Sequence, residues 1–182
     1  TPLVACNNLP PLDPGEPDSS VESLFNGLTE ILAFEKFEIK DQTMAKSCIA
    51  GILLLHNRLE ASHKISQDIE NPTGSYWHGL MHRREPDFSN SKYWFRQFKK
   101  HPVWIDLCPS AKELAKENRS DAAIDFLQKQ EVWDPFAFID LCESALGSGS
   151  DKEQLCREIQ MCEWKLLFDY SFNHAIVKYL LS

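Results

Sequence analysis

The heptapeptide IDLCPSA at residues 105–111 recurs as IDLCESA at residues 139–145, with six identities in seven positions at an offset of 34. Prolines 72, 102 and 135 recur at similar intervals, each after a predicted second helix. A period of this length accommodates two helices. One such pair cannot cover its own apolar face, so neighbouring pairs must stack to complete a core. The repeat therefore predicts an all-α fold of stacked antiparallel helical hairpins.

Two segments resemble known families. Residues 54–72 form a unit of helix, short turn, helix and closing proline. With the period near 34, this unit resembles a tetratricopeptide repeat, and the resemblance implies an array of such hairpins. Residues 74–95, GSYWHGLMHRREPDFSNSKYWF, resemble a signature in a group of uncharacterised bacterial and fungal proteins. That second resemblance implies no activity.

Helix signals follow one another from residue 19 onward. Capping boxes at 19–22 and 150–153 open the first and last helices, because the Ser and Glu side chains each satisfy a free backbone donor. The last helix would be about 45 Å long at 1.5 Å per residue, which favours a kink. The expected helices are one that buries Leu24, Leu28, Ile31 and Leu32, followed by 43–57, 59–69, 75–85, 89–100, 109–118, 120–130, 135–146 and 151–181.

The first residues differ in composition from the rest. Residues 1–17 contain five of the ten prolines and no periodic pattern, which predicts an extended arm. Residues 18–182 have the length of one domain and predict a single helical unit closed by the long final helix. Hydrophobic residues are 43% and charged residues 25%, so wholesale disorder is excluded.

The net charge of −8 argues against nucleic acid or an anionic membrane surface as a partner. No apolar run approaches the ~18 residues of a membrane span. The sequence shows no signal peptide and begins without Met, which leaves open whether a segment precedes it. Six cysteines without a C-x-x-C pair predict reduced, buried thiols in a cytoplasmic protein.

The segment 75–85 contains the main candidates for chemistry. On a helix with 100° per residue, His78, His82 and Glu85 fall within an arc of about 60°. Two imidazoles one turn apart can bind one metal ion, and a carboxylate beyond them can be a third ligand or a base. His63, on the preceding helix, faces the same groove if the hairpins stack. One hypothesis is therefore a hydrolase that depends on a divalent metal.

The expectation that we favour from sequence is a binding groove for an anion. Between residues 81 and 100, six basic residues stand against two acidic ones. Arginine binds carboxylates and phosphates through paired donors, and histidine adds a charge that depends on pH. We expect a non-enzymatic module without a cofactor that binds an anionic small molecule or an acidic peptide; a scaffold without a pocket is a third alternative. The expected ligand-binding residues are His63, His78, His82, Arg83, Arg84, Asn90, Lys92 and Tyr93.

Overall fold

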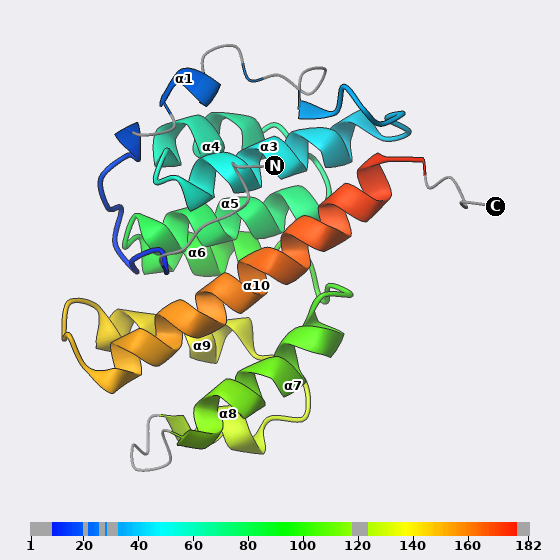
Figure 1. Cartoon of the computed structure of the whole chain (residues 1–182). Helices are drawn as coiled ribbons and strands as arrows, with labels where there is room; N and C mark the ends of the chain where they lie inside the picture. The colour runs from blue at the N-terminus through cyan, green and yellow to red at the C-terminus, as the bar shows by residue number, and fades with distance from the viewer. Residues whose placement is uncertain (1–8, 20–21, 26–27, 29–32, 118–123, 178–182) are drawn as a thin grey trace.

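Helix α10 (Asp151–Ala175) crosses the molecule, and α3 (Gln42–Leu55), α7 (Trp104–Leu114) and α9 (Pro135–Ala145) pack against it (Figure 1). The structure is a computed structural model that describes residues 9–19, 22–25, 28, 33–117 and 124–177. The remaining elements are α1 (Glu22–Phe25), α4 (Leu59–Ser66), α5 (Pro72–Arg84), α6 (Phe88–Phe95), the 3₁₀ turn η3 (Ala115–Glu117) and α8 (Asp125–Lys129).

The all-α class predicted from the repeat is confirmed. Across the described ranges the only β-type pairing is an isolated bridge between Ile39 and Ile176. Consecutive helices α3, α4, α5 and α6 pack against one another in chain order, whereas α3, α7 and α9 all contact α10. The tetratricopeptide-like stacking itself stays a prediction. Within the same ranges no helix is long and apolar enough to cross a membrane.

Side-chain caps explain where several helices begin. Asp41, Asn71, Asp87 and Asp134 accept hydrogen bonds from the first free backbone N–H groups of α3, α5, α6 and α9. Ser150 does the same for α10, while the Glu153 carboxylate accepts from the backbone N–H of Gly149. The predicted capping box at 150–153 therefore operates in a slightly shifted form.

Several predicted helix limits were wrong. The expected helices 59–69 and 75–85 left residues 71–74 outside any helix. Instead, Asn71 caps α5 and Pro72 is the first residue of that helix, where proline loses no helical hydrogen bond. Helix α6 ends at Phe95 rather than near residue 100. Pro109 lies inside α7 rather than at its start, five residues after Trp104.

The remaining predicted ends are confirmed only in part. Helix α10 ends at Ala175, and residues 178–182 of the predicted helix lie outside the described residues. The first predicted helix is confirmed only over Glu22–Phe25. Residues 29–32 and 118–123, which were also expected to be helical, lie outside the described part of the chain, as do residues 1–8 of the arm.

The centre of the core lies where α3, α5 and α10 meet. The indole Nε1 of Trp164 donates to the carbonyl of Gly51 at 2.8 Å, and that of Trp77 donates to Ser171 Oγ at 3.2 Å. A Cβ at position 51 would lie only 2.7 Å from the Trp77 ring, so glycine is required for this close approach. Trp164 and Trp133 are both buried in this core.

Candidate functional site

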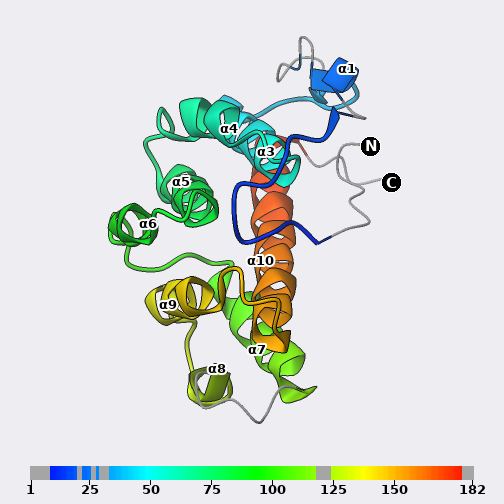
Figure 2. The same cartoon turned by 90° about the vertical axis from the view of Figure 1, so that its left-hand side faces the viewer.

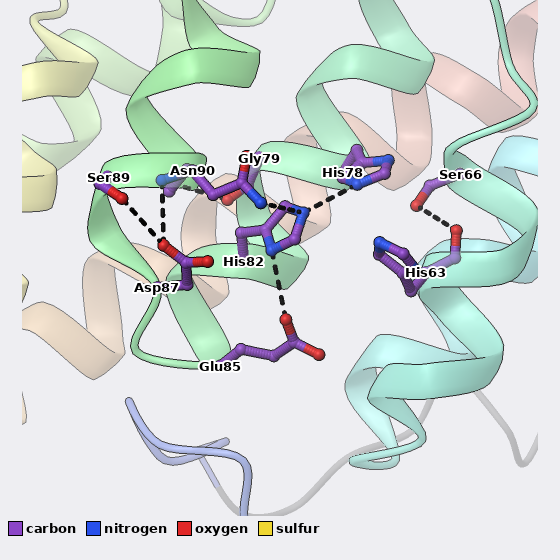
Figure 3. A network of polar contacts seen from close by, with 10 residues as sticks. His63, Ser66, His78, Gly79, His82, Glu85, Asp87, Ser89 and Asn90 are labelled. Atoms are coloured by element: carbon purple, nitrogen blue, oxygen red, sulfur yellow. Dashed lines mark hydrogen bonds and ion pairs between the residues drawn. The ribbon is translucent and has the colours of Figure 1, made fainter.

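Three histidines from two helices face one another. His63 comes from α4, and His78 and His82 come from successive turns of α5 (Figure 3). One potential ligand atom from each lies within 4.8 Å of the other two. The Nε2 atoms of His78 and His82 are 2.9 Å apart. The ring of His63 meets both other rings edge to face, at centroid distances of 4.7 and 5.3 Å.

Helix α5 is buried along almost its whole length, which explains how two histidines come to lie inside the protein. Gly79 lets α6 approach closely, because a Cβ there would lie 2.8 Å from the ring of Phe95. Ser91 on α6 donates to the Gly79 carbonyl at 2.7 Å. The H-G-x-x-H spacing therefore places α6 directly beside the two imidazoles.

Side chains of α6 and of the α5–α6 turn surround the imidazoles. The ring of Trp94 stacks on His78 at a centroid distance of 4.0 Å. Asn90 Nδ2 lies 3.2 Å from Nε2 of His82, and a carboxylate oxygen of Glu85 lies 3.2 Å from Nδ1 of the same ring (Figure 3). His82 is therefore held from both nitrogens.

His78 and His82 are uncharged at neutral pH. Burial, with smaller contributions from His82 and His63, lowers the pKa of His78 to about 3. Burial also lowers the pKa of His82, although the nearby carboxylate of Glu85 acts in the opposite direction. A neutral imidazole has a nitrogen lone pair free for a metal ion, whereas a protonated one has none.

The cluster lies at the floor of an open hollow of about 550 Å³. The residues lining it come from α4, the α4–α5 turn, α5 and α6, and they are His63, Gln67, Asp68, His78, His82, Asn90, Tyr93 and Trp94. Five of these are among the residues expected from the sequence. The hollow thus joins an imidazole cluster to a polar, open mouth.

The three basic side chains predicted for the groove do not line this hollow. Arg83 is buried and donates to Glu163 on α10 at 2.5 Å. Arg84 donates to backbone carbonyls of residues 13 and 14 and to Asn57, and Lys92 pairs with Asp140. Successive residues on a helix point about 100° apart, so Arg83 and Arg84 leave α5 on sides other than that of the histidines.

Glu85 differs from its predicted place as a metal ligand. It contacts the outer nitrogen of His82 instead of facing the cluster, and His63 completes the group of three. Carboxylates that bind the outer nitrogen of a ligating histidine are common in metal sites, where they orient the ring.

Gln67, Asp68 and Trp94 line the hollow but were not predicted from the sequence. The stacking of Trp94 on His78 depends on how α5 and α6 cross, which local spacing does not predict. Gln67 and Asp68 lie in the turn that follows α4, where no periodic pattern indicates direction. Their proximity to His63 along the chain was the only available signal.

No protein-family model matches this chain, and no curated protein or solved structure matches it either.

Proposed function

We propose that this protein binds a divalent transition metal through His63, His78 and His82. The observation that supports this proposal is the mutual distance of the three candidate ligand atoms, all within 4.8 Å. Imidazole suits zinc, copper, iron and nickel, and three imidazoles form one of the standard zinc donor sets. The low pKa values of His78 and His82 keep both nitrogens available for a metal at neutral pH.

A metal accounts for the hollow better than an anion does. No lysine or arginine is among the residues that line it, and its one acidic lining residue is Asp68. Arg83, Arg84 and Lys92, on which the anion hypothesis depended, have partners elsewhere. A doubly charged cation is therefore the better electrostatic match.

The open side of the cluster favours hydrolytic chemistry. Three protein ligands leave one position of a tetrahedral metal for water or substrate, which distinguishes catalytic from structural zinc sites. A metal bound in this way supplies a water molecule of lowered pKa as nucleophile. Asp68 is the lining carboxylate that can accept a proton, and Asn90 and Tyr93 offer hydrogen bonds to a substrate. We therefore propose a metal-dependent hydrolase.

Metal analysis of the purified protein tests the binding step. We expect one zinc, copper, iron or nickel ion per chain in the wild type, and loss of that metal in both His78→Ala and His82→Ala. His174→Ala is the matched control, because His174 lies exposed on α10 and bonds only within its own helix turn. The proposal is wrong if the wild type binds no metal in a Co²⁺ or Zn²⁺ titration, or if both cluster variants bind it as well as the control.

A second assay separates hydrolysis from binding. The metal-loaded protein is offered carboxylic esters, amides and phosphate esters, and the His78→Ala variant serves as the blank. Turnover that needs the metal supports a hydrolase. Stoichiometric metal without turnover of any of these substrates would reject the hydrolase and leave a metal-binding protein.

We also propose a reducing, cytoplasmic location. The cysteines in the described part of the chain, Cys48, Cys108, Cys142, Cys156 and Cys162, are free thiols, and four of them are buried. Disulfides are rare in compartments where thioredoxin and glutathione keep thiols reduced. Labelling of the thiols in freshly lysed cells tests this location, and recovery of disulfides would contradict it.

A further inference from the structure

The proline-rich segment 9–16 lies against the helices in an unusual way. It runs across α10 beside α5 (Figure 2) and is held by side chains that donate to its backbone carbonyls. Arg157 Nε reaches the carbonyl of Pro10 at 3.1 Å, and Gln160 Nε2 reaches that of Pro11 at 3.1 Å. Arg84 Nε reaches the carbonyl of residue 13 at 3.0 Å.

The far end of the segment is held in the same manner. Arg84 Nη2 donates to the carbonyl of Pro14 at 3.2 Å, and Asn57 Nδ2 donates to that of Glu16 at 2.8 Å. Asn57 also accepts from Arg84 at 2.6 Å, so the two side chains form one unit. Gly15 fits here because its φ is +63° and a Cβ would lie 2.9 Å from Asn57.

These contacts recognise the extended backbone of the segment rather than its side chains. Each of the four side chains that hold the segment donates hydrogen bonds, and each of these bonds ends on a backbone carbonyl oxygen of the segment. The four side chains are Asn57, Arg84, Arg157 and Gln160. A proline-rich chain presents carbonyls but few N–H groups, so it matches a groove of donors. The side-chain anchor is Leu12, which is 2% exposed, and Pro10 is buried against Leu54, Leu80 and Trp164.

The segment leaves two features of the groove poorly matched. The side-chain oxygen of Gln160 is buried and has no hydrogen-bond partner among the residues that the structure describes, and neither Pro10 nor Pro11 has an N–H to give it. Arg84 is 2% exposed, yet its hydrogen bonds go to two carbonyls and an amide rather than to a carboxylate.

We propose that the groove formed by Asn57, α5 and α10 is a docking site for an extended, acidic, proline-rich segment of a partner protein. Residues 9–16 occupy it in cis. The partner would supply a leucine-like anchor, a carboxylate facing Arg84 and an N–H for Gln160. The site is independent of the histidine cluster. An acidic peptide was expected from the sequence to bind beside the histidines, and we propose this groove as its binding site instead.

Displacement of the cis segment in the full chain tests the proposal. Leu12→Glu removes the anchor and vacates the groove, and the labelled peptide LPPLDPGEPD (residues 9–18) is the probe in fluorescence anisotropy. A tethered segment competes at an effective concentration of about 1 mM, so a peptide of ~10 μM affinity would bind the wild type roughly 100-fold more weakly than the variant. Absence of peptide binding to a folded Leu12→Glu chain would overturn the proposal.

Variants of the groove locate the binding. Adding Arg157→Ala and Gln160→Ala to the Leu12→Glu chain is expected to weaken peptide binding at least tenfold, whereas the matched control Arg96→Ala, directly after α6, leaves it unchanged. Equal binding by both would place the peptide elsewhere and reject the groove. If Leu12→Glu does not fold, Gly15→Ala releases the segment from its other end and is tested in the same way.

Changes in the peptide separate a docking site from a strap that fits only itself. Replacing Pro11 of the peptide by Ala restores an N–H near Gln160 and is expected to tighten binding several-fold. A weakening by this change and by Pro10→Ala would show that the groove serves only its own segment, and would overturn the proposal. If the wild type forms dimers and the peptide dissociates them, the occupant of the groove is a second copy of this chain. This result would also overturn the proposal.

Discussion

The Nδ1 atom of His82 lies 3.2 Å from a carboxylate oxygen of Glu85, three residues further along the chain. The negative charge of this carboxylate favours the proton of His82 on Nδ1, and a proton there leaves Nε2 free on the side of His78. Glu85 therefore belongs to the support of the proposed metal site. Because Glu85 contacts the outer nitrogen of His82, we expect it to orient this ligand rather than to bind the metal itself.

Glu85→Gln is expected to weaken metal binding by about 10–100-fold, the range seen when a residue that orients a ligand is lost. The amide keeps the size of the side chain but loses the charge that favours the proton on Nδ1. Competition with a chelator measures the affinity, and Glu60→Gln, in an exposed pair with Lys64, is the control. Unchanged affinity in Glu85→Gln would contradict the supporting role.

His63→Ala is expected to weaken metal binding more than Glu85→Gln does, beyond the ~100-fold upper end expected when a residue that only orients a ligand is lost. It removes a ligand and leaves only the pair on α5. The visible spectrum of bound Co²⁺ reports the ligand set, so its band should lose intensity and shift in this variant. An unaltered spectrum would mean that His63 is not a ligand.

Glu163→Gln is expected to destabilise the fold by about 3–5 kcal/mol. Arg83 and Glu163 are 1% and 0% exposed, and Tyr76 donates to the second carboxylate oxygen at 2.7 Å. Loss of the charge leaves a buried guanidinium without its counter-ion. Urea unfolding measures the change. Lys64→Ala, which breaks an exposed pair, should change the stability by less than ~1 kcal/mol.

His101 is expected to make the protein sensitive to acid between about pH 6.5 and pH 4. Its Nδ1 accepts from the backbone N–H of Val103 at 3.3 Å, and its Nε2 lies 3.2 Å from Thr73 Oγ1. Burial, with a smaller effect of His174, lowers its pKa to about 4. The unfolded chain, with an ordinary pKa of about 6.5, binds more protons in this window, so stability falls as the pH falls.

Urea unfolding at pH 7 and pH 4.5 checks this expectation for His101. The wild type should lose about 2 kcal/mol more than His101→Gln over that interval, because glutamine cannot be protonated. The comparison is made within each protein, so any destabilisation by the substitution itself cancels. Equal losses in the two proteins would show that His101 does not contribute to acid sensitivity.

The sequence predicted the all-α class and most helix positions because caps and periodicity are local. Asp134 before Pro135 and the pair Ser150 and Glu153 mark helix starts without knowledge of the tertiary fold. Two predicted limits failed at prolines. Pro72 fits the first turn of α5 because no helical hydrogen bond is lost there, whereas Pro109 lies inside α7, where tertiary packing overrides the local preference.

The candidate site was predictable only in part for a similar reason. The spacing of His78 and His82 fixes their common face of α5, and this face does meet His63. The direction of Arg83 and Arg84 depends on what packs against each remaining face. Glu163 on α10 and the carbonyls of residues 13 and 14 lie 80 and about 70 residues away along the chain, respectively. Local spacing cannot predict such partners.

The dependence of the core on α10 has a consequence for biosynthesis. Gly51 and Tyr76 find their partners on α10, at Trp164 and Glu163, which are translated about 90 to 110 residues later. While the ribosome is still adding α9, the nascent chain exposes the apolar faces that α10 will cover. Completion of the tertiary structure must therefore wait for residues 151–175 to emerge, and until then the chain is a natural client for chaperones.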